Sequence, residues 1–212
     1  MLCPVSTLHS GGVKARNDRL GKTLLGQGQT EGGIKELRAA LRIKPADARG
    51  HNTLGIALFQ QGQVEEGITE FREASHLDPA NAEVHNNLAK VLLEQGGTEE
   101  ALAEAQKALE LQPASETFQN NLAWMLATAQ PASLRNGARA IQLATQASQS
   151  SGGKDPNILR TLAAADAEAG DYHDALQTAQ SALRLAETAD FADTLRRDIQ
   201  FYETGRPLPN GQ

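Results

Sequence analysis

Aromatic residues are scarce in this chain of 212 residues: five phenylalanines, two tyrosines and one tryptophan make up 4% of it. Cysteine occurs once, at Cys3, so an internal disulfide is excluded and the redox compartment stays open. Basic residues number 20 against 26 acidic ones, which gives a net charge of -6. Because nucleic acids and anionic membranes attract clustered Lys and Arg, neither is expected as a partner.

Long hydrophobic runs are also missing. A bilayer-spanning helix needs about 18 consecutive apolar residues, and no stretch approaches that length, so we expect no membrane insertion. The first residues have neither a basic segment nor a sustained apolar core, which argues against a signal peptide, and too little apolar sequence precedes Cys3 for a lipid-modified cysteine. We predict a cytoplasmic protein, or a periplasmic one if the chain is part of a longer membrane protein.

Recognisable catalytic motifs are absent as well. The chain has no Gly-x-Ser-x-Gly, no phosphate-binding glycine loop and no His-Glu-x-x-His. Cys3 lies near the terminus without an obvious base to activate it. We therefore expect no enzyme activity, no cofactor and no metal.

A repeat of 34 residues is what the chain does contain. Each repeated leucine precedes a small residue, and a proline series keeps the same step. The leucines are Leu20, Leu54, Leu88 and Leu122, and the prolines are Pro45, Pro79 and Pro113. A fixed period in this range is typical of a stacked array of helix pairs.

Within each repeat the apolar residues have helical spacing, as in Leu54, Leu58, Ile68 and Phe71. Glycine-containing turns separate two helical stretches, and the second stretch ends before proline, which cannot continue a helix. The turn glycines are Gly28, Gly62, Gly96 with Gly97, and Gly170. Small residues recur where helices must approach closely, among them Gly33, Gly67 and Ala101.

This combination of Leu-Gly/Ala, a second Leu, spaced small residues and Pro resembles the tetratricopeptide repeat (TPR) pattern over roughly residues 14–189. The resemblance implies an all-α fold, a right-handed TPR solenoid of five helix pairs plus a C-terminal capping helix. Units start near 14, 48, 82, 116 and 156. We predict a disordered lead-in over 1–13, a capping helix over 190–206 with Phe191, Leu195, Ile199 and Tyr202 on one face, and a loose tail over 207–212.

The register breaks once, by an insertion near 129–137. We expect Pro131 to end one helix, Ser133 to cap a lengthened second helix, and Asp155 to cap the helix that begins at Pro156. This part resembles the closing units of large bacterial TPR proteins, some of which follow a membrane-embedded sugar-transfer region.

The resemblance implies that the first helix of each pair lines a concave groove that holds a partner's segment. Asparagine stands at the fifth position of three consecutive units, and an amide both donates to and accepts from a peptide backbone. The candidate groove residues are Asn52, Asn86, Asn87, Asn120, Asn121, Arg49, Lys90 and Trp124. Two alternatives stay open: the asparagines are inherited by repeat duplication, and Trp124 fills space beside the insertion.

Other candidates favour structural roles. A family subtype binds chaperone carboxylates with Lys and Asn, but Asp18 and Glu83 would repel that ligand here. His51 and His85 share the fourth position of consecutive units, too far apart for one zinc, so we expect them to pack between helices. Asp166 replaces a repeated leucine, and we expect it to face solvent or to pair with Arg160, Arg196 or Arg197.

The sequence thus predicts a non-catalytic protein-interaction module that binds a protein or peptide partner. The first alternative is a self-assembling scaffold. The second is the C-terminal TPR region of a larger bacterial enzyme, such as a membrane sugar transferase.

Overall fold

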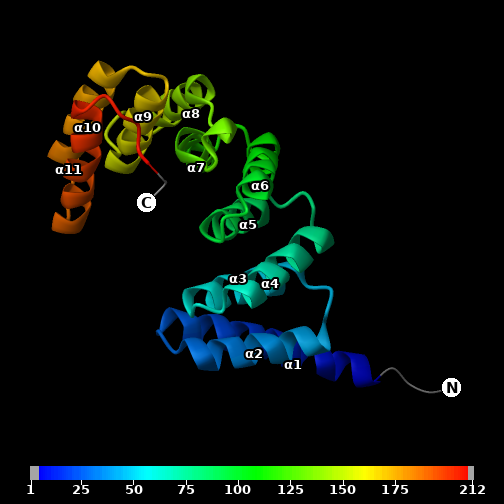
Figure 1. Ribbon diagram of the computed structural model, residues 1–212. Helices are drawn as coiled ribbons and strands as arrows, with labels where there is room; N and C mark the ends of the chain where they lie inside the picture. Colours follow the sequence, from blue (N-terminus) through cyan, green and yellow to red (C-terminus); the bar gives the residue numbers. More distant parts are fainter. Residues whose placement is uncertain (1–4, 210–212) are drawn as a thin grey trace. The chain divides into compact units, whose positions relative to one another are not determined.

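The computed structural model describes residues 5–209, and the side chains of residues 12–209. Within that range it contains eleven α-helices, one short 3₁₀ helix and no strand (Figure 1). The helices are α1 (Val5–Gly26), α2 (Thr30–Ile43), α3 (Ala48–Gln60), α4 (Val64–Leu77), α5 (Ala82–Glu94), α6 (Thr98–Leu111), α7 (Glu116–Thr128), η1 (Ala132–Leu134), α8 (Gly137–Ser150), α9 (Pro156–Glu168), α10 (Tyr172–Leu185) and α11 (Ala189–Glu203). This order confirms the expected all-α class with five successive helix pairs and a final helix. None of these described helices is both long and apolar enough to cross a bilayer.

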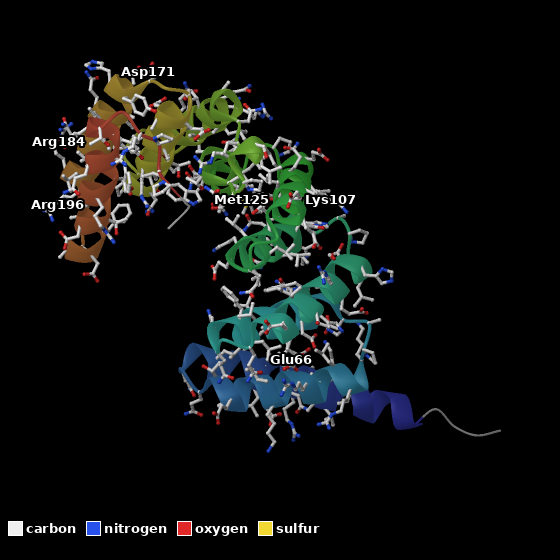
Figure 2. All side chains as sticks on the ribbon, in the orientation of Figure 1. Glu66, Lys107, Met125, Asp171, Arg184 and Arg196 are labelled. Atoms are coloured by element: carbon white, nitrogen blue, oxygen red, sulfur yellow. The ribbon has the colours of Figure 1, made fainter. Side chains whose placement is uncertain are left out.

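The chain forms two compact units, Met1–Gln95 and Gly96–Gln212. In the first unit α1 packs on α2 and α3 on α4, and α2 and α4 each also contact the helix that follows. In the second unit α7 packs on α8, α9 on α10, and α11 on α10. Charged side chains such as Lys107, Arg184 and Arg196 project from the exposed helix faces (Figure 2).

The two helices of a pair approach closely where a large residue on one helix faces a small residue on the other. Gly55 of α3 faces Phe71 of α4, and a Cβ added at Gly55 would lie 2.9 Å from the phenylalanine ring. Gly21 faces Leu37 in the preceding pair in the same way. The equivalent positions of the fifth pair hold two buried alanines, Ala163 and Ala179. In the first two pairs the large residue is therefore accommodated because the opposite helix has glycine.

The predicted turn glycines are confirmed by their backbone. Gly62 has a φ of 75°, a conformation that costs glycine little and other residues more. Its neighbour Gln63 donates its N–H to the carbonyl of Leu58, so the turn satisfies a carbonyl that the helix end leaves open. The same positive φ occurs at Gly28, Gly96 and Gly170.

The inserted residues lie where the sequence places them, between α7 and α8, but the expected capping residue is wrong. Asn136, rather than Ser133, accepts a hydrogen bond from the backbone N–H of Arg139 at 3.0 Å. The helix α8 has 14 residues, the length of α2 and α4, so it is not lengthened. Ser133 does not cap α8 because the inserted residues form a compact loop instead. Arg135 holds this loop by donating its Nε–H to the carbonyl of Ala129 at 2.7 Å.

The expected cap at Asp155 is confirmed. Its carboxylate accepts hydrogen bonds from the N–H groups of Asn157 and Ile158, and Pro156 occupies the first turn of α9. Proline suits this place because the first N–H groups of a helix have no intrahelical partner.

The two ends of the array differ from expectation. The helix α1 begins at Val5, so residues 5–13 have helical backbone where a disordered lead-in is expected. Residues 207–209 are packed rather than loose, since Leu208 is buried and Pro209 accepts a hydrogen bond from Gln130 at 2.7 Å. The apolar Leu208 gains free energy by leaving water, which fixes this part of the tail. Residues 1–4, with Cys3, and 210–212 lie outside the described residues.

The final helix, α11, matches the expected cap. Leu195 and Tyr202 are buried, and Phe191 and Ile199 on the same face are half-buried. The fifth helix pair is therefore covered by an apolar face, as a terminal repeat requires.

We predict that Gly55→Ala lowers the free energy of unfolding by about 1–3 kcal/mol, because its methyl group overlaps Phe71. In the background of Phe71→Ala the same substitution costs nothing further, so urea unfolding of the two single variants and the double variant gives a strongly non-additive cycle. Gly26→Ala is the control, since a Cβ there meets no atom within 4 Å. Additive losses would contradict the size-pairing account.

Candidate functional site

In the first unit the structure brings together two predicted groove residues, Asn52 of α3 and Asn87 of α5. The Asn87 amide donates to the Asn52 carbonyl oxygen at 3.1 Å, and both side chains are half-buried. Asn86, the fifth-position asparagine of α5, is only 8% exposed. The expected row of fifth-position amides is therefore replaced here by a pair between a fifth and a sixth position.

Two cations flank this amide pair. Arg49 lies one turn before Asn52 on α3, and Lys90 lies one turn after Asn87 on α5; both are exposed. Residues three apart share a helix face, so the surface around the pair offers hydrogen-bonding amides between two positive charges. Such a surface suits a peptide backbone with an acidic side chain nearby.

In the second unit Trp124 of α7 forms a stack with Arg160 of α9. The guanidinium carbon lies 4.4 Å from the centroid of the half-buried indole. This distance lies within the range of cation–π attraction. Trp124 thus contacts a residue of the next repeat.

Arg160 is held in turn by Asp198 of α11. Its Nε donates to the Asp198 carboxylate at 2.6 Å, and that carboxylate is 6% exposed. Burial raises the pKa of Asp198, while the hydrogen bond and charge of Arg160 act in the opposite direction. Arg160 stands at the fifth position of its unit, where three earlier units have asparagine, but its sequence position does not indicate Asp198 as its partner.

The other predicted residues of the second unit, Asn120 and Asn121, are half-buried on α7. The side-chain oxygen of Asn120 is buried and has no hydrogen-bond partner among the described residues. A buried carbonyl without a partner costs free energy, so this position is suited to accept a hydrogen bond.

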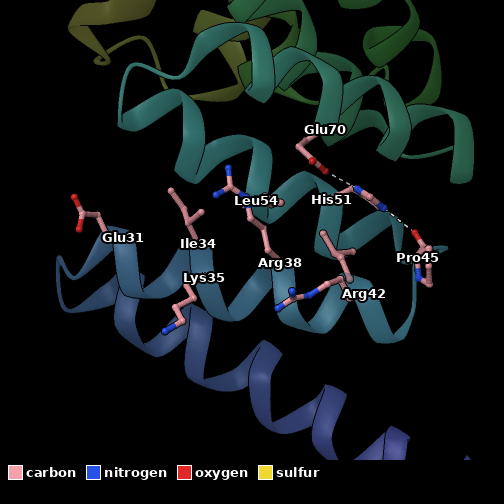
Figure 3. Close-up of a pocket in the computed structure, with 10 residues that line it drawn as sticks. Glu31, Ile34, Lys35, Arg38, Arg42, Pro45, His51, Leu54 and Glu70 are labelled. Atoms are coloured by element: carbon pink, nitrogen blue, oxygen red, sulfur yellow. Dashed lines mark hydrogen bonds and ion pairs between the residues drawn. The ribbon is translucent and has the colours of Figure 1, made fainter.

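A cavity of about 600 Å³ opens in the first unit among α2, α3 and α4 (Figure 3). Its apolar lining comes from Ile34, Leu41 and Leu54, and charged side chains surround it. Arg38 bridges this side of α2 to Glu66 of α4 at 2.5 Å. The volume lies within the range of ligand pockets. No sequence motif marks the cavity, because its lining residues come from three helices and the loop at Pro45.

His51 stands at one side of this cavity. Its Nδ1 lies 2.5 Å from Glu70 and its Nε2 lies 2.7 Å from the carbonyl of Pro45, as the dashed lines in Figure 3 mark. Both nitrogens face acceptors, which favours the imidazolium. Burial lowers the pKa of His51, but these two hydrogen bonds and the nearby carboxylates outweigh burial and raise it above 6.5.

The fourth position of the units has a common structural task. His85 contacts the carbonyl of Pro79 at 3.1 Å and Gln119 donates to that of Pro113 at 2.8 Å, each six residues back, as in His51. These side chains therefore fix the loop between repeats, which agrees with the expected packing role. Within the described part of the chain, no group of three or more His, Cys, Asp or Glu residues is arranged to hold a metal ion.

Asp166 is buried in α9, which corrects the expectation that it faces solvent or pairs with an arginine. Arg160 is committed to Asp198 instead. Burial raises the pKa of Asp166 from 3.8 to about 7, and Asp174 and Asp171 act in the same direction. The carboxyl group therefore resists ionisation near neutral pH.

We predict that His51→Gln keeps the bond to Pro45, as Gln119 does in its unit, but loses the ion pair with Glu70. Because folding raises the His51 pKa, the pair stabilises the fold fully below pH 6.5 and is lost as pH rises through the folded-state value. Urea unfolding of His51→Gln and of Glu70→Gln should each show a loss of about 1–2 kcal/mol at pH 6 that disappears in alkaline solution. A loss that is equal at all pH values would contradict the ion pair.

We predict that Asp166→Asn stabilises the protein above neutral pH. The folded state holds the Asp166 proton up to a pH of about 7 and the unfolded state releases it near 3.8, so wild-type stability falls between these values. Thermal unfolding should show no gap between variant and wild type below pH 4, and a gap of about 2–4 kcal/mol above pH 8. The exposed Asp190→Asn is the control, and a gap independent of pH would refute the buried carboxyl.

Known repeat families match the chain in sequence. A model described as "TPR repeat" matches residues 21–62 and 55–96, and one described as "Tetratricopeptide repeat" matches residues 86–154. No curated protein matches the chain with significance.

Solved structures resemble the chain in fold. A tetratricopeptide repeat protein from Parabacteroides merdae has a TM-score of 0.76 at 18% identity, covering 92% of this chain and 75% of its own. Pseudomonas aeruginosa PilF has a TM-score of 0.70 at 22% identity, covering 92% and 91%. YrrB, titled a TPR protein with an unusual peptide-binding site, has a TM-score of 0.68 at 15% identity, covering 85% and 90%.

The repeat models span more than half of the sequence, and the helix pairs have the arrangement of the solved structures. The chain belongs to the tetratricopeptide repeat family.

Proposed function

We propose that this protein is a non-catalytic interaction module that binds a segment of a protein partner on the face formed by the first helices of its repeats. The observation behind the proposal is the amide pair of Asn52 and Asn87, which lies between the exposed cations Arg49 and Lys90. The family resemblance supports the same class of function.

The amide pair keeps capacity for a peptide backbone. Each amide has two N–H donors and one carbonyl acceptor, and the bond from Asn87 to Asn52 uses one donor and one lone pair. The bond also fixes both side chains, which lowers the entropy lost when a partner binds. A fixed pair of amides therefore recognises backbone groups without requiring a particular partner sequence.

The second unit supports the proposal through Trp124. Tryptophan and arginine are the residues most often found at the centres of binding surfaces, and here they are stacked and held by Asp198. Asn120, whose side-chain oxygen has no partner among the described residues, lies one turn before Trp124 on the same helix face.

YrrB is described as having an unusual peptide-binding site, and at 15% identity it supports the class of function and not the site. The corresponding site in the present protein is proposed from its own residues.

A specific observation favours a second candidate, self-association. Leu20 is 40% exposed, whereas its equivalents Leu54, Leu88 and Leu122 are buried. An exposed leucine at a position that other repeats bury offers an apolar contact to a second copy. Sedimentation of the wild type over a range of protein concentrations measures whether its mass increases through self-association. Leu20→Glu should abolish any such increase that depends on the Leu20 contact.

The partner-binding proposal is tested by affinity capture from a lysate of the source organism, followed by calorimetric titration of the captured partner. We predict that a variant with Asn52→Ala, Asn87→Ala and Asn120→Ala binds at least tenfold more weakly, about 1.4 kcal/mol, because it loses amide contacts to the partner's backbone.

The matched control removes three exposed amides from second helices, with Gln146→Ala, Gln149→Ala and Gln180→Ala. Circular dichroism first establishes equal helix content in all variants. Equal affinity of the two triple variants would place the site elsewhere and reject the proposal.

A further inference from the structure

Half of the chain's aromatic residues lie on two helices of the second unit, and Arg160 of α9 contacts a residue of each. They are Trp124 of α7 and Phe191, Phe201 and Tyr202 of α11. Tyr202 is part of the buried cap, whereas Trp124, Phe191 and Phe201 are half-buried. In a chain with so few aromatics, three partly exposed rings near one arginine form a surface with the composition of a binding site.

A cavity lies beside the rings of Phe191 and Phe201. It has a volume of about 470 Å³ and lies among α9, α11 and residues 208–209. Phe191, Phe201 and Leu208 supply apolar walls, and Arg160 and Arg197 supply positive charge. Arg160 thus both lines the cavity and stacks on Trp124, a residue of the proposed binding face.

The charge around the cavity is positive on balance. Asp198, which lines it, is neutralised by its ion pair with Arg160. Arg197 is exposed and donates to the neutral hydroxyl of Thr194 at 3.1 Å, and Arg206 lies over the Phe201 ring at 5.6 Å from its centroid. An apolar cavity bordered by guanidinium groups complements an apolar group that has a carboxylate beside it.

The chain's own tail shows that a non-helical segment fits next to this cavity. Leu208 inserts its side chain and is 4% exposed. The carbonyl of Pro209 accepts hydrogen bonds from Gln130 at 2.7 Å and from Arg135 at 3.3 Å. One buried apolar side chain and two hydrogen bonds to a single main-chain carbonyl thus contribute to holding this irregular segment on the surface.

We infer that the cavity between α9 and α11 is a docking site for a partner segment with a bulky apolar side chain next to aspartate or glutamate. The apolar side chain enters between Phe191 and Phe201, and the carboxylate pairs with Arg197. This inference rests on the proposed function, because it names the chemistry of the segment that the second unit selects.

The test uses fluorescence anisotropy with three short fluorescein-labelled peptides in a glycine–serine background. Their cores are Glu-Phe-Glu, Lys-Phe-Lys and Glu-Ser-Glu. We predict that the full-length protein binds the Glu-Phe-Glu peptide at least tenfold more tightly than the other two, since only this peptide supplies both the ring and the carboxylates.

Charge reversal then tests the assigned residue. Arg197→Glu should weaken binding of the Glu-Phe-Glu peptide at least tenfold and strengthen binding of the Lys-Phe-Lys peptide. Arg184→Glu is the matched control, because Arg184 is an exposed arginine of α10 that also donates to a hydroxyl three residues earlier, at Ser181. This control should change neither affinity.

The inference is overturned if the wild type shows no preference for the Glu-Phe-Glu peptide. It is also overturned if Arg184→Glu and Arg197→Glu have equal effects. Either result would leave the proposed function itself untouched, because the capture experiment with the asparagine variants tests that function independently. Failure in that experiment, with the Arg197 preference intact, would reject the asparagine residues as the binding face and leave the cavity between α9 and α11 as a separate docking site.

Discussion

The close approach of paired helices at small residues is the constraint on which the rest of this structure depends. Gly55 can face Phe71 only because it lacks a Cβ, and the fifth repeat has two small buried residues, Ala163 and Ala179, at the same positions. When helix separation is constant, each repeat places its fifth and sixth positions on the same face. The surface that bears Asn52 and Asn87 therefore depends on the packing of the helices that carry these two residues.

Much of the fold can be predicted because repeat period, turn glycines and prolines act locally. Gly62 ends a helix through its own backbone, and Asp155 caps one through hydrogen bonds to residues two and three positions on. Where prediction fails, a distant contact decides. Ser133 is not a cap because Arg135 holds the inserted loop through Ala129 and Glu168, and the tail is packed because Leu208 is buried.

In the candidate site, too, local sequence signals can be predicted and distant contacts cannot. Sequence position identifies Asn52, Asn87 and Trp124 as residues of one helix face, but their partners lie 35 or more residues away along the chain. Arg160 breaks the asparagine pattern, and that departure is a signal that the sequence does contain. Asp198 gives no such signal, since an acidic residue on an amphipathic helix is expected at the surface, and only the packing of α11 buries it.

Trp124 gives the most direct test of the claim that partners bind on the first-helix face of the second unit, because it is the only tryptophan of the chain. Its fluorescence can be followed while the partner segment, identified by capture, is titrated into the wild-type protein. The account predicts a saturable change in emission and protection from acrylamide quenching, with the dissociation constant that calorimetry gives. Saturable calorimetric binding with unchanged Trp124 emission and quenching would contradict it.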